Sequence, residues 1–385
     1  MTEEFRMNQA EIDRAVEHFR SLLKQQILRA ERLSESETDR GNTFPKTVIG
    51  LIGGDGIGPI IVQEAKRVLE FLLKEELKSG SVELKEIDGL TIENRIAAGK
   101  AIPDDVLEAI KSCDVLLKGP TTTPSGGTME SANVTLRREL DLFANVRPVS
   151  VSSLGIDWTF FRENTEGEYT LGSKGIAIGD ALTMDFKVTT EAGTRRIARA
   201  AFDFARKNGK NHVSVVTKSN IMKKTDGMFS RICWEVASEY PEIETDEYYI
   251  DIMTANLINP EMRNRFQVFL LPNLYGDILT DEAAQLQGGV GTAGSANLGT
   301  RYAMFEAIHG SAPRLIEQGL GSYASPQSIL QATVMLLSHI GMPNKAQRLS
   351  EGLKAAAALC PIDGTAAHAT CAEFGDALLK CLLDR

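Results

Sequence analysis

The sequence is poor in cysteine, and its cysteines form no pair of the kind that binds a metal or closes a small disulfide loop. There are five among 385 residues, and no two of them stand in a C-x-x-C pattern. An odd, scattered set of cysteines indicates reduced thiols in a cytosol-like compartment. The five are Cys113, Cys233, Cys360, Cys371 and Cys381.

Long apolar runs and an excess of basic residues are also missing. No stretch approaches the roughly 18–20 apolar residues of a membrane span. The N-terminus has neither the apolar core of a secretory signal nor the acid-poor composition of an organelle transit peptide. The 42 Lys and Arg residues are outnumbered by 52 Asp and Glu residues, which gives a net charge of −10 and argues against binding to nucleic-acid phosphates. We therefore expect a cytoplasmic protein with no nucleic-acid and no membrane partner.

A glycine-rich turn is present, but it lacks the dinucleotide-binding pattern. The turn at 53–59 follows a β-branched run at 47–52 and precedes a helical pattern. A G-x-G-x-x-G motif started at Gly54 would end at Pro59, and one started at Gly56 would end at isoleucine. The phosphate-binding motif G-x-x-x-x-G-K-[ST] does not occur either. The pattern therefore predicts a tight turn with positive φ and no Rossmann domain.

The length and composition suit a globular α/β protein. Hydrophobic residues make up 43% and charged residues 24% of the 385 positions. That is enough for about two domains whose cores need no disulfide or structural metal. β-Branched runs alternate with patterns of helical period, the order typical of α/β folds. Strands are predicted at 47–52, 114–117, 213–217 and 268–272, and helices at 58–77, 104–111, 191–208 and 326–340.

The first 40 residues predict a separate amphipathic helix. Apolar residues recur there at steps of three and four, with charged residues between them. A polar stretch from Ser34 to Asn42 follows and predicts a linker. Two interpretations stay open: the helix lies on its own domain, or it stabilises an oligomer or regulates the protein. The apolar residues are Ile12, Val16, Phe19, Leu23, Ile27, Ala30 and Leu33.

A set of polar and basic residues points to a small acidic ligand. Ser131 and Asn133 precede Arg137, which lies four residues after Asn133 and so on the same face of a helix. Arg147 and Arg162 follow. Arginine binds a carboxylate through two parallel hydrogen bonds, so three arginines near small polar donors suit a compact polycarboxylate. Each arginine taken alone would more often belong to a surface ion pair.

Two aspartates and a lysine indicate further chemistry. Asp277 and Asp281 are four residues apart, so a helix would direct both carboxylates to one side, as Mg²⁺ or Mn²⁺ requires. The alternative is an acidic helix N-terminus. Lys218, followed by Asn220, comes directly after the strand at 213–217, where α/β proteins bind ligands. It is a candidate proton carrier, or otherwise an ordinary loop residue.

Two further motifs carry one candidate residue each. Tyr169 ends the string RENTEGEY and is a candidate general acid, although a lone tyrosine more often packs in a core. His309 lies in a loop marked by glycine and proline, where it could hydrogen-bond to a base or stack on it, or have a structural role.

Together and in this order, these segments resemble the β-decarboxylating dehydrogenases, which act on isocitrate, 3-isopropylmalate, homoisocitrate or tartrate. The resemblance covers nearly the whole chain except the first 45 residues. Ser131, Asn133 and Arg137 match the Ser-x-Asn-x-x-x-Arg of isocitrate dehydrogenases, where isopropylmalate enzymes carry apolar side chains. The strings RENTEGEY at 162–169 and ANVRP at 144–148 look like NAD-linked isocitrate enzymes of mitochondrial type.

The resemblance implies the isocitrate/isopropylmalate dehydrogenase-like fold, which is α/β and non-Rossmann. It implies a large discontinuous domain at 46–142 and 289–385 on the cofactor side, and a smaller α/β domain at 143–288 with dimer contacts. Residues 1–45 would then be an extra N-terminal helix and linker.

The resemblance also implies a homodimer with shared active sites. In the family, the neighbouring subunit supplies the residues that match Lys218 and Asp251. We expect the N-terminal helix to add contacts beyond the dimer, because its apolar stripe needs a partner surface.

The implied reaction is the oxidative decarboxylation of isocitrate to 2-oxoglutarate, a step of the tricarboxylic acid cycle, with reduction of NAD. Lys218 and an aspartate would remove the C2 hydroxyl proton, and Tyr169 would protonate C3 after CO₂ leaves. The residues implied to hold the substrate carboxylates are Ser131, Asn133, Arg137, Arg147 and Arg162. Those implied to bind Mg²⁺ or Mn²⁺ are Asp251, Asp277 and Asp281. Those implied to contact the cofactor are Thr123, Asn220, Glu306, His309, Gly310, Ala312 and Arg314.

The cofactor has an alternative, and so does the activity. Arg314-Leu315 stands where NAD-linked members usually have Asp and NADP-linked bacterial members have Lys-Tyr, and Ser325 replaces an Asn. Arginine suits the 2′-phosphate of NADP, but no Tyr and Arg near 355–360 complete a phosphate clamp, so we expect NAD, with NADP as the second choice. Two other activities stay open: a dehydrogenase that acts on 3-isopropylmalate, homoisocitrate or tartrate, and a non-catalytic regulatory subunit, a class that typically lacks catalytic residues.

Overall fold

The computed structural model describes residues 9–35, 46–123, 129–172 and 174–383, which form two compact units. Unit 1 consists of Met1–Asp39 and Phe161–Asp277, and unit 2 of Arg40–Phe160 and Ile278–Arg385. The resemblance places the domain crossings after residues 142 and 288 and sets the first 45 residues apart, and these bounds stay a prediction. The compact units of the structure divide after residues 160 and 277, and the N-terminal residues group with the central segment.

Unit 2 contains a mixed sheet with the strand order β2-β1-β3-β12-β11-β4. β1 pairs in parallel with β2 and β3, and β3 with β12, whereas β11 is antiparallel to β12 and β4. A Rossmann domain has a parallel sheet, so the antiparallel β11 distinguishes this sheet from it. This agrees with the incomplete glycine motif, from which no Rossmann domain is expected. The strands are β1 (Thr47–Ile52), β2 (Val82–Glu86), β3 (Val115–Lys118), β4 (Ala144–Val151), β11 (Gly294–Leu298) and β12 (Ala303–Ala307).

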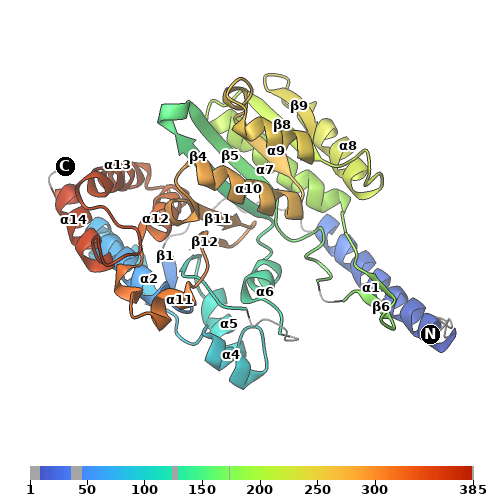
Figure 1. The fold of residues 1–385 in the computed structure, drawn as a ribbon, viewed down its shortest axis with the longest axis horizontal. Helices are drawn as coiled ribbons and strands as arrows, with labels where there is room; N and C mark the ends of the chain where they lie inside the picture. The colour runs from blue at the N-terminus through green and yellow to red at the C-terminus, as the bar shows by residue number, and fades with distance from the viewer. Residues whose placement is uncertain (1–8, 36–45, 124–128, 173, 384–385) are drawn as a thin grey trace. The chain divides into compact units, whose positions relative to one another are not determined.

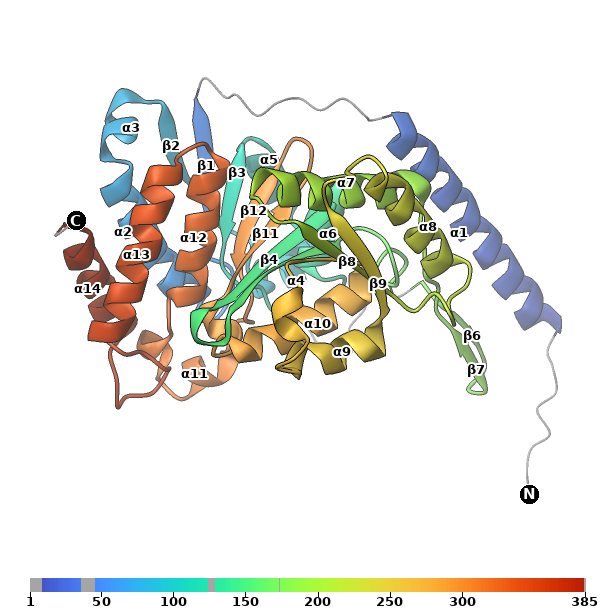
Figure 2. The same cartoon turned by 90° about the horizontal axis from the view of Figure 1, so that it is seen from above.

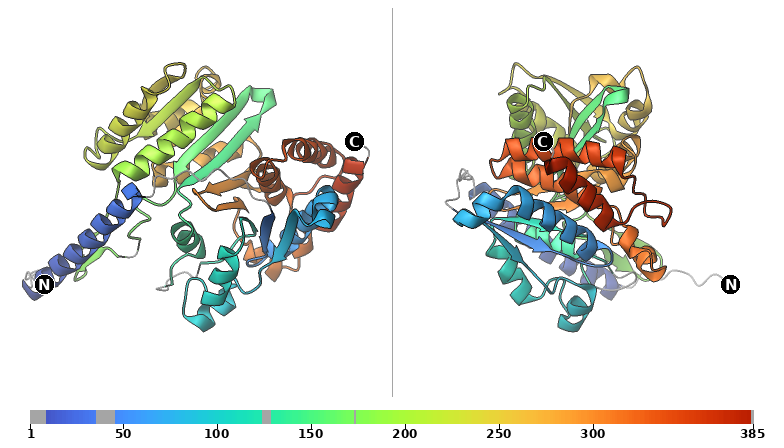
Figure 3. Two further views of the ribbon diagram at one scale, coloured as in Figure 1. Left: turned by 180° about the vertical axis from the view of Figure 1, so that it is seen from behind. Right: turned by 90° about the vertical axis from the view of Figure 1, so that its left-hand side faces the viewer.

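Helices cover both faces of this sheet. Figure 2 shows α12 beside α13, and the right view of Figure 3 shows the red and orange helices close to the blue α2. A separate hydrophobic cluster joins α5 and α6 to the strands through residues such as Ile110, Leu136 and Met304, all fully buried. The helices are α2 (Gly58–Leu72), α3 (Lys74–Ser79), α4 (Ile92–Ala98), α5 (Asp104–Lys111), α6 (Ala132–Glu139), α11 (Pro313–Glu317), α12 (Gln327–His339), α13 (Pro343–Leu359) and α14 (Cys371–Leu383).

Unit 1 is built on three parallel strands in the order β10-β8-β9. Helices α7 and α8 pack against each other, and α9 follows β9 directly (Figure 1). Helix α1 contacts α7 and the β6–β7 hairpin. The elements are α1 (Gln9–Glu35), β6 (Ile176–Ile178), β7 (Leu182–Met184), α7 (Glu191–Lys207), β8 (His212–Thr217), α8 (Thr225–Ala237), β9 (Glu244–Tyr249), α9 (Ile250–Ile258) and β10 (Val268–Leu271).

Two elements continue across the division between the units. They are strand β5 (Ile156–Glu163) and helix α10 (Asn273–Leu286). Arg162 lies near the end of β5, and Asp277 and Asp281 lie one turn apart on α10.

The glycine turn has the backbone conformation that the sequence predicts. Gly54 and Gly56 have φ of 73° and 59°. A Cβ at Gly54 would lie 2.2 Å from the carbonyl oxygen of Pro120, so a side chain is excluded there by space as well as by conformation. The prediction of one helix to residue 77 is wrong in one respect. α2 ends at Leu72, and a separate α3 ends at Ser79, where Gly80 caps it with a left-handed φ of 76°.

The N-terminal amphipathic helix is confirmed as α1, and only part of its apolar surface is covered in this chain. Leu22 is 3% exposed, whereas Val16, Leu23 and Ile27 are each about half exposed. The expected linker at 34–42 lies mostly outside the described residues. Within the described ranges, no helix is both long enough and apolar enough to cross a membrane.

Candidate active site

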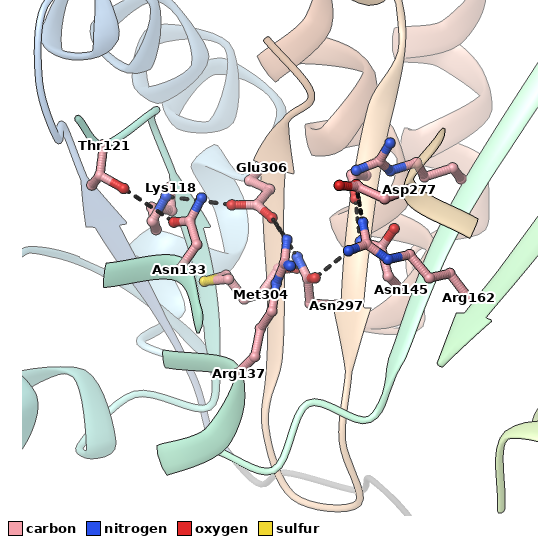
Figure 4. Close-up of polar contacts among 12 residues, drawn as sticks. Lys118, Thr121, Asn133, Arg137, Asn145, Arg162, Asp277, Asn297, Met304 and Glu306 are labelled. Carbon is pink, nitrogen blue, oxygen red and sulfur yellow. Dashed lines mark hydrogen bonds and ion pairs between the residues drawn. The ribbon is translucent and has the colours of Figure 1, made fainter. Parts of the chain in front are cut away.

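Helix α6 presents two of the expected substrate ligands on one face, as the sequence predicts. Asn133 lies in its first turn and Arg137 one turn later. Ser131 is the N-cap residue, although its side chain makes no capping hydrogen bond. The Oδ1 atom of Asn133 accepts a hydrogen bond of 3.1 Å from Thr121 Oγ1 (Figure 4). Since Oδ1 is occupied, the Nδ2 group is the one that can donate to a ligand.

Arg137 faces a buried carboxylate on strand β12. Its Nη2 atom lies 3.4 Å from Glu306 Oε1, and Lys118 Nζ lies 3.3 Å from Glu306 Oε2 (Figure 4). β3 and β12 pair in register at Lys118 and Glu306, so these side chains leave the sheet side by side. Burial opposes ionisation of Glu306, but the charges of Lys118 and Arg137 and a hydrogen bond from Asn297 lower its pKa to about 2. Glu306 is therefore an ionised group that fixes both cations.

Lys118 is a site residue that the sequence did not single out. Its side chain is fully buried, and Nζ also donates to the carbonyl of Gly119 at 2.9 Å. Burial lowers the pKa of Lys118, and the charge of Glu306 opposes that effect. One feature of the sequence could have identified Lys118. It is the last residue of the apolar strand β3, much as Lys218 follows the strand at 213–217.

A buried amide network adjoins this cluster. Asn145 Nδ2 donates to Ser295 Oγ at 2.8 Å and to Asn297 Oδ1 at 2.9 Å. Asn297 in turn donates to Glu306 at 2.8 Å (Figure 4). All are nearly or fully buried, so the network fixes the carboxylate that holds Arg137.

Arg147 on β4 holds one of the two aspartates of α10. Its Nη1 atom donates to Thr280 Oγ1 at 2.6 Å and to Asp281 Oδ1 at 3.0 Å. The arginine side chain is 8% exposed and the Asp281 side chain 60% exposed. The carboxylate therefore lies at the surface while its cation is buried.

Arg162 holds the other aspartate of α10. It forms an ion pair with Asp277 Oδ1, and its Nε and Nη2 atoms donate to Asn273 Oδ1 at 2.9 and 2.7 Å. Tyr169 donates to Asp277 Oδ2 at 2.8 Å. A Cβ at Gly276 would lie 2.6 Å from Arg162 Cγ, so the helix approaches the arginine closely only because glycine is there. The structure thus brings three residues that the sequence singles out into one hydrogen-bonded group, namely Arg162, Tyr169 and Asp277.

Lys218 pairs with the third aspartate, Asp251, in the first turn of α9. The distance from Lys218 Nζ to Asp251 Oδ1 is 2.6 Å. This hydrogen bond is the main reason that the pKa of Asp251 is lowered. The backbone nitrogen of Lys218 donates to Asp226 Oδ2 at 2.8 Å, and Asp226 is fully buried, so the start of the loop after β8 is fixed.

The three expected metal ligands each carry a basic partner of their own. Their side chains are 37% exposed for Asp277, 60% for Asp281 and 62% for Asp251. No three acidic, histidine or cysteine side chains in the described part of the chain are arranged to hold a metal ion. The donor chemistry nevertheless fits, because carboxylate oxygens are the ligands that Mg²⁺ and Mn²⁺ prefer, and two of the three lie one turn apart on α10.

In unit 2, the glycine turn is tied to two further loops. Asp55 is buried and accepts from the backbone nitrogens of Ile92 at 2.8 Å and Thr122 at 2.7 Å. Thr122 Oγ1 lies 2.8 Å from Ser311 Oγ, and Ser311 O accepts from Ile57 N at 3.1 Å. The loops around residues 55, 122 and 311 are thereby fixed to one another, and they carry most of the expected cofactor contacts.

Among the residues expected to contact the cofactor, His309 has one ring nitrogen with a hydrogen-bond partner and one without a partner among the residues described. His309 Nδ1 lies 3.0 Å from Gly310 O, and burial holds the pKa of His309 below its usual value. Its Nε2 atom is buried and has no hydrogen-bond partner within the residues that the structure describes. Ala312 has a left-handed φ of 47°, a conformation that is rare outside glycine. An orphaned imidazole nitrogen in this loop fits a polar ligand such as a nucleotide.

The remaining cofactor candidates are exposed, and their roles stay predictions. Thr123 and Gly310 are exposed in unit 2, and Asn220 is exposed in unit 1. Arg314 is exposed on α11. Glu306, expected to contact the cofactor, holds Lys118 and Arg137 in this structure.

Comparison with known proteins places these observations in a family context. The sequence model of the isocitrate/isopropylmalate dehydrogenase family matches residues 48–378. The isocitrate dehydrogenase [NADP] of Rickettsia prowazekii is 39% identical over 318 residues, which is 80% of this chain and 62% of that protein. This chain thus spans less than two thirds of the length of the Rickettsia relatives.

Other relatives are named as NAD-linked enzymes. Isocitrate dehydrogenase [NAD] subunit 2, mitochondrial, of Schizosaccharomyces pombe is 37% identical over 79% of both chains. The mitochondrial alpha subunit of the isocitrate dehydrogenase [NAD] of Macaca fascicularis is 36% identical over 82% of this chain and 89% of its own. Among solved structures, the isocitrate dehydrogenase from Methylococcus capsulatus superposes with a TM-score of 0.77 and 35% identity, over 87% of this chain and 99% of that chain.

Proposed function

Because the chain belongs to the isocitrate/isopropylmalate dehydrogenase family, we propose that it catalyses the oxidative decarboxylation of isocitrate to 2-oxoglutarate with reduction of NAD. One observation carries the choice of isocitrate within the family, namely the polar face of α6. Asn133 and Arg137 share that face, and Thr121 orients the amide of Asn133. An isopropyl group placed there would leave the amide without a partner, at a cost of about 1–3 kcal/mol.

In this proposal, Arg147 and Arg162 release an aspartate of the chain and bind a carboxylate of the substrate instead. Arg147 and Arg162 pair with Asp281 and Asp277 in the chain itself. Isocitrate brings three carboxylates, and bidentate pairing with arginine gives them both charge and orientation. Ser131, Asn133 and Arg137 complete the proposed carboxylate contacts.

The aspartates released from the arginines become ligands in the same proposal. Asp251, Asp277 and Asp281 would hold Mg²⁺ or Mn²⁺, which when bound supplies Lewis-acid polarisation of the substrate C2 oxygen. We propose a homodimer as the working unit, in which Lys218 and Asp251 serve the site of the neighbouring subunit. The exposure of all three carboxylates supports their availability to an ion.

Two side chains move protons in the proposed reaction. Lys218, which is paired with Asp251, would pass its own proton to an aspartate so that its amine can take the proton of the C2 hydroxyl, while the C2 hydride would go to the nicotinamide when the cofactor is bound. Tyr169 donates its phenolic proton to C3 after CO₂ leaves, because its hydroxyl already donates toward the α10 carboxylate Asp277. A hydroxyl that can donate without a large movement suits a general acid.

The cofactor is proposed to be NAD, with NADP as a second candidate favoured by one observation. Arg314 is exposed on α11, and no hydrogen bond or ion pair of its side chain occurs among the described residues. A free guanidinium suits a 2′-phosphate. The ratio of kcat/KM with NAD to that with NADP decides between them. The cytoplasmic location expected from the sequence stays a prediction, since three of the relatives are named as mitochondrial proteins.

A substitution on α6 tests the proposed substrate. Asn133→Leu removes the amide and is expected to lower kcat/KM for isocitrate about tenfold, while activity on 3-isopropylmalate does not fall. Arg138→Met on the same helix is the matched control, because Arg138 pairs with Glu130 at 2.7 Å and is exposed. Equal losses for both acids in Asn133→Leu would refute the choice of isocitrate.

A further inference from the structure

Helix α1 lies outside the residues that the family model matches, yet it packs closely on the rest of unit 1. Leu22 is 3% exposed, and the rings of Phe19 and Phe186 lie 5.3 Å apart. His18 Nε2 lies 3.0 Å from the carbonyl oxygen of Lys174. These contacts dock the helix along one side, which brings its C-terminal half to the loop that follows β5.

Arg29 connects α1 to that loop through two groups. Its Nη1 atom lies 3.1 Å from Glu166 Oε1, and its Nη2 atom donates to the carbonyl of Thr165 at 3.4 Å. The side chain of Arg29 is 22% exposed, whereas that of Glu166 is only 4% exposed. Thr190 completes the surroundings of Glu166 with hydrogen bonds from its backbone nitrogen at 2.8 Å and from its hydroxyl at 2.5 Å.

The same residue, Glu166, fixes the orientation of Arg162 through a buried amide. The carbonyl oxygen of Glu166 accepts from Asn273 Nδ2 at 2.9 Å. The other side of that amide, Asn273 Oδ1, accepts from Arg162 Nε at 2.9 Å and Nη2 at 2.7 Å. Gly167 follows with a φ of 74°, and a Cβ there would lie 3.0 Å from Asn273 Cβ, so the loop and the amide have little room to shift. Arg29 is therefore connected to Arg162 through the side chain and backbone carbonyl of Glu166 and then through the amide of Asn273.

The local charges make Arg29 important for this path. Glu163 and Glu166 are both nearly fully buried, three residues apart. Burial, and next the charge of Glu166, raise the pKa of Glu163 to about 7. The cations that face this pair are Arg29 from α1 and Arg196 from α7, which donates to Thr165 Oγ1 at 3.2 Å. Without Arg29, a buried carboxylate would lose its ion-pair partner, which is costly enough to displace the loop.

We propose that Arg29 is a positioning residue that fixes the Arg162 guanidinium through Glu166 and Asn273, and thereby makes α1 part of the support of the active site. The kinetic part of this proposal rests on the proposed function, because it assumes that Arg162 holds a carboxylate of isocitrate. The structural part, the connection from α1 to the loop at 163–170, does not depend on any activity.

The test compares Arg29→Met and Arg29→Lys with Arg32→Met in the full chain. Arg32 is an exposed arginine of the same helix whose Nε donates to Leu28 O of α1 itself, at 3.2 Å, so it is a matched control. Hydrogen exchange of residues 163–170 is measured by mass spectrometry, together with kcat and the KM for isocitrate and for the cofactor. Thermal unfolding of each variant establishes that it is folded.

Arg29→Met is expected to exchange faster at residues 163–170 and to raise the KM for isocitrate by about 3- to 30-fold, with the KM for the cofactor unchanged. Arg29→Lys should show a smaller change of the same kind, because lysine keeps the charge but not the fork of donors. Arg32→Met should match the wild type. If Arg29→Met does not fold, the Arg29→Lys comparison decides alone.

Two results would overturn the proposal. One is wild-type exchange and wild-type KM for isocitrate in the folded Arg29 variants. The other is a fall in kcat with both KM values unchanged, which would mean a loss of folded enzyme only. A wild-type chain that does not turn over isocitrate would refute the proposed function instead, and the exchange measurement would still decide whether Arg29 fixes the loop.

Discussion

Lys218 Nζ lies 2.6 Å from Asp251 Oδ1, so an aspartate proposed to bind metal is neutralised by a lysine proposed to move a proton. The same relationship recurs twice on α10, where Arg162 pairs with Asp277 and Arg147 with Asp281. Each basic residue is more buried than its aspartate. In the chain by itself, each of the three proposed metal ligands is therefore paired with a basic residue of the proposed site.

Cooperative binding of metal and isocitrate follows from these pairs. Either ligand alone must break ion pairs and leave one partner uncompensated, whereas both together give every charge a new partner. Isocitrate is expected to bind at least about fivefold more tightly with saturating Mg²⁺ than in EDTA, and Mg²⁺ to gain the same factor from isocitrate. Isothermal titration, corrected for the direct association of Mg²⁺ with isocitrate in buffer, measures both. Equal affinities with and without metal would contradict the exchange of partners.

Tyr169→Phe should remove a proton donor without disturbing the surrounding packing. The hydroxyl donates to Asp277 at 2.8 Å, and the ring faces the Arg162 guanidinium at 5.3 Å, a contact that phenylalanine keeps. We expect kcat to fall about 10²- to 10⁴-fold with little change in the KM for isocitrate. Steady-state kinetics measure both.

A second tyrosine provides the control for this substitution. Tyr240 also donates to an aspartate, Asp203, at 2.9 Å, on a part of unit 1 that carries none of the proposed site residues. Tyr240→Phe should therefore keep kcat near the wild-type value. A similar loss of kcat in both variants would show that Tyr169 has no special role.

Lys118→Met should destabilise the protein because it leaves Glu306 with one cation fewer in a buried setting. The pair lies 3.3 Å apart, with the lysine fully buried. Removing one partner of a buried ion pair costs about 3–5 kcal/mol, and Arg137 and Asn297 remain, so we expect a loss of about 3 kcal/mol in the free energy of unfolding. Denaturation by urea measures it. Lys111→Met, which removes an exposed pair with Glu139, should leave the midpoint nearly unchanged, and equal midpoints for both variants would contradict the account.

Stability should fall as the pH rises through about 7 because of Glu163. Its pKa is raised from 4.5 to about 7 by burial and by the charge of Glu166. The folded chain therefore binds a proton between these values that the unfolded chain has released, so this contribution is full below pH 4.5 and lost above 7. The decrease contributed by this group is at most about 3 kcal/mol.

Glu166→Gln tests this effect, since it removes the charge next to Glu163. It also removes the ion pair with Arg29, so the comparison uses the pH dependence of stability and not its absolute value. The decrease in the free energy of unfolding between pH 5.5 and 8.5 should be smaller in the variant than in the wild type, because the Glu163 pKa moves back toward its usual range. Urea unfolding across that range measures the difference. Parallel pH dependences would show that the two glutamates do not interact.

The elements with strong local patterns were predictable from the sequence. The strand at 47–52 and the helix at 104–111 agree with β1 and α5 residue for residue, because each has a regular apolar period and a clear beginning and end. The break between α2 and α3 was not predictable in this way. The helical period continues through Leu73, and no glycine or proline marks the position where the two helices separate.

The candidate site could be predicted only as a set of separate motifs. Asn133 and Arg137 share a face of α6 because their spacing is local, but the pairing of Arg137 with Glu306 joins residues 169 positions apart. Lys118 was missed because its strand reads as an apolar run, and only the register of β3 with β12 shows its partner. The contact between Arg29 and Glu166 likewise depends on how α1 docks, which its periodicity does not specify.

The most direct test of the central claim is turnover by the purified chain across the four candidate acids. Isocitrate, 3-isopropylmalate, homoisocitrate and tartrate are each supplied with Mn²⁺ and with NAD or NADP, and reduced cofactor, CO₂ and 2-oxoglutarate are quantified. We expect isocitrate to give the highest kcat/KM, with NAD preferred, one CO₂ and one 2-oxoglutarate for each cofactor reduced, and no turnover in EDTA. A chain that leaves isocitrate unchanged, or that prefers one of the other three acids, would contradict the account.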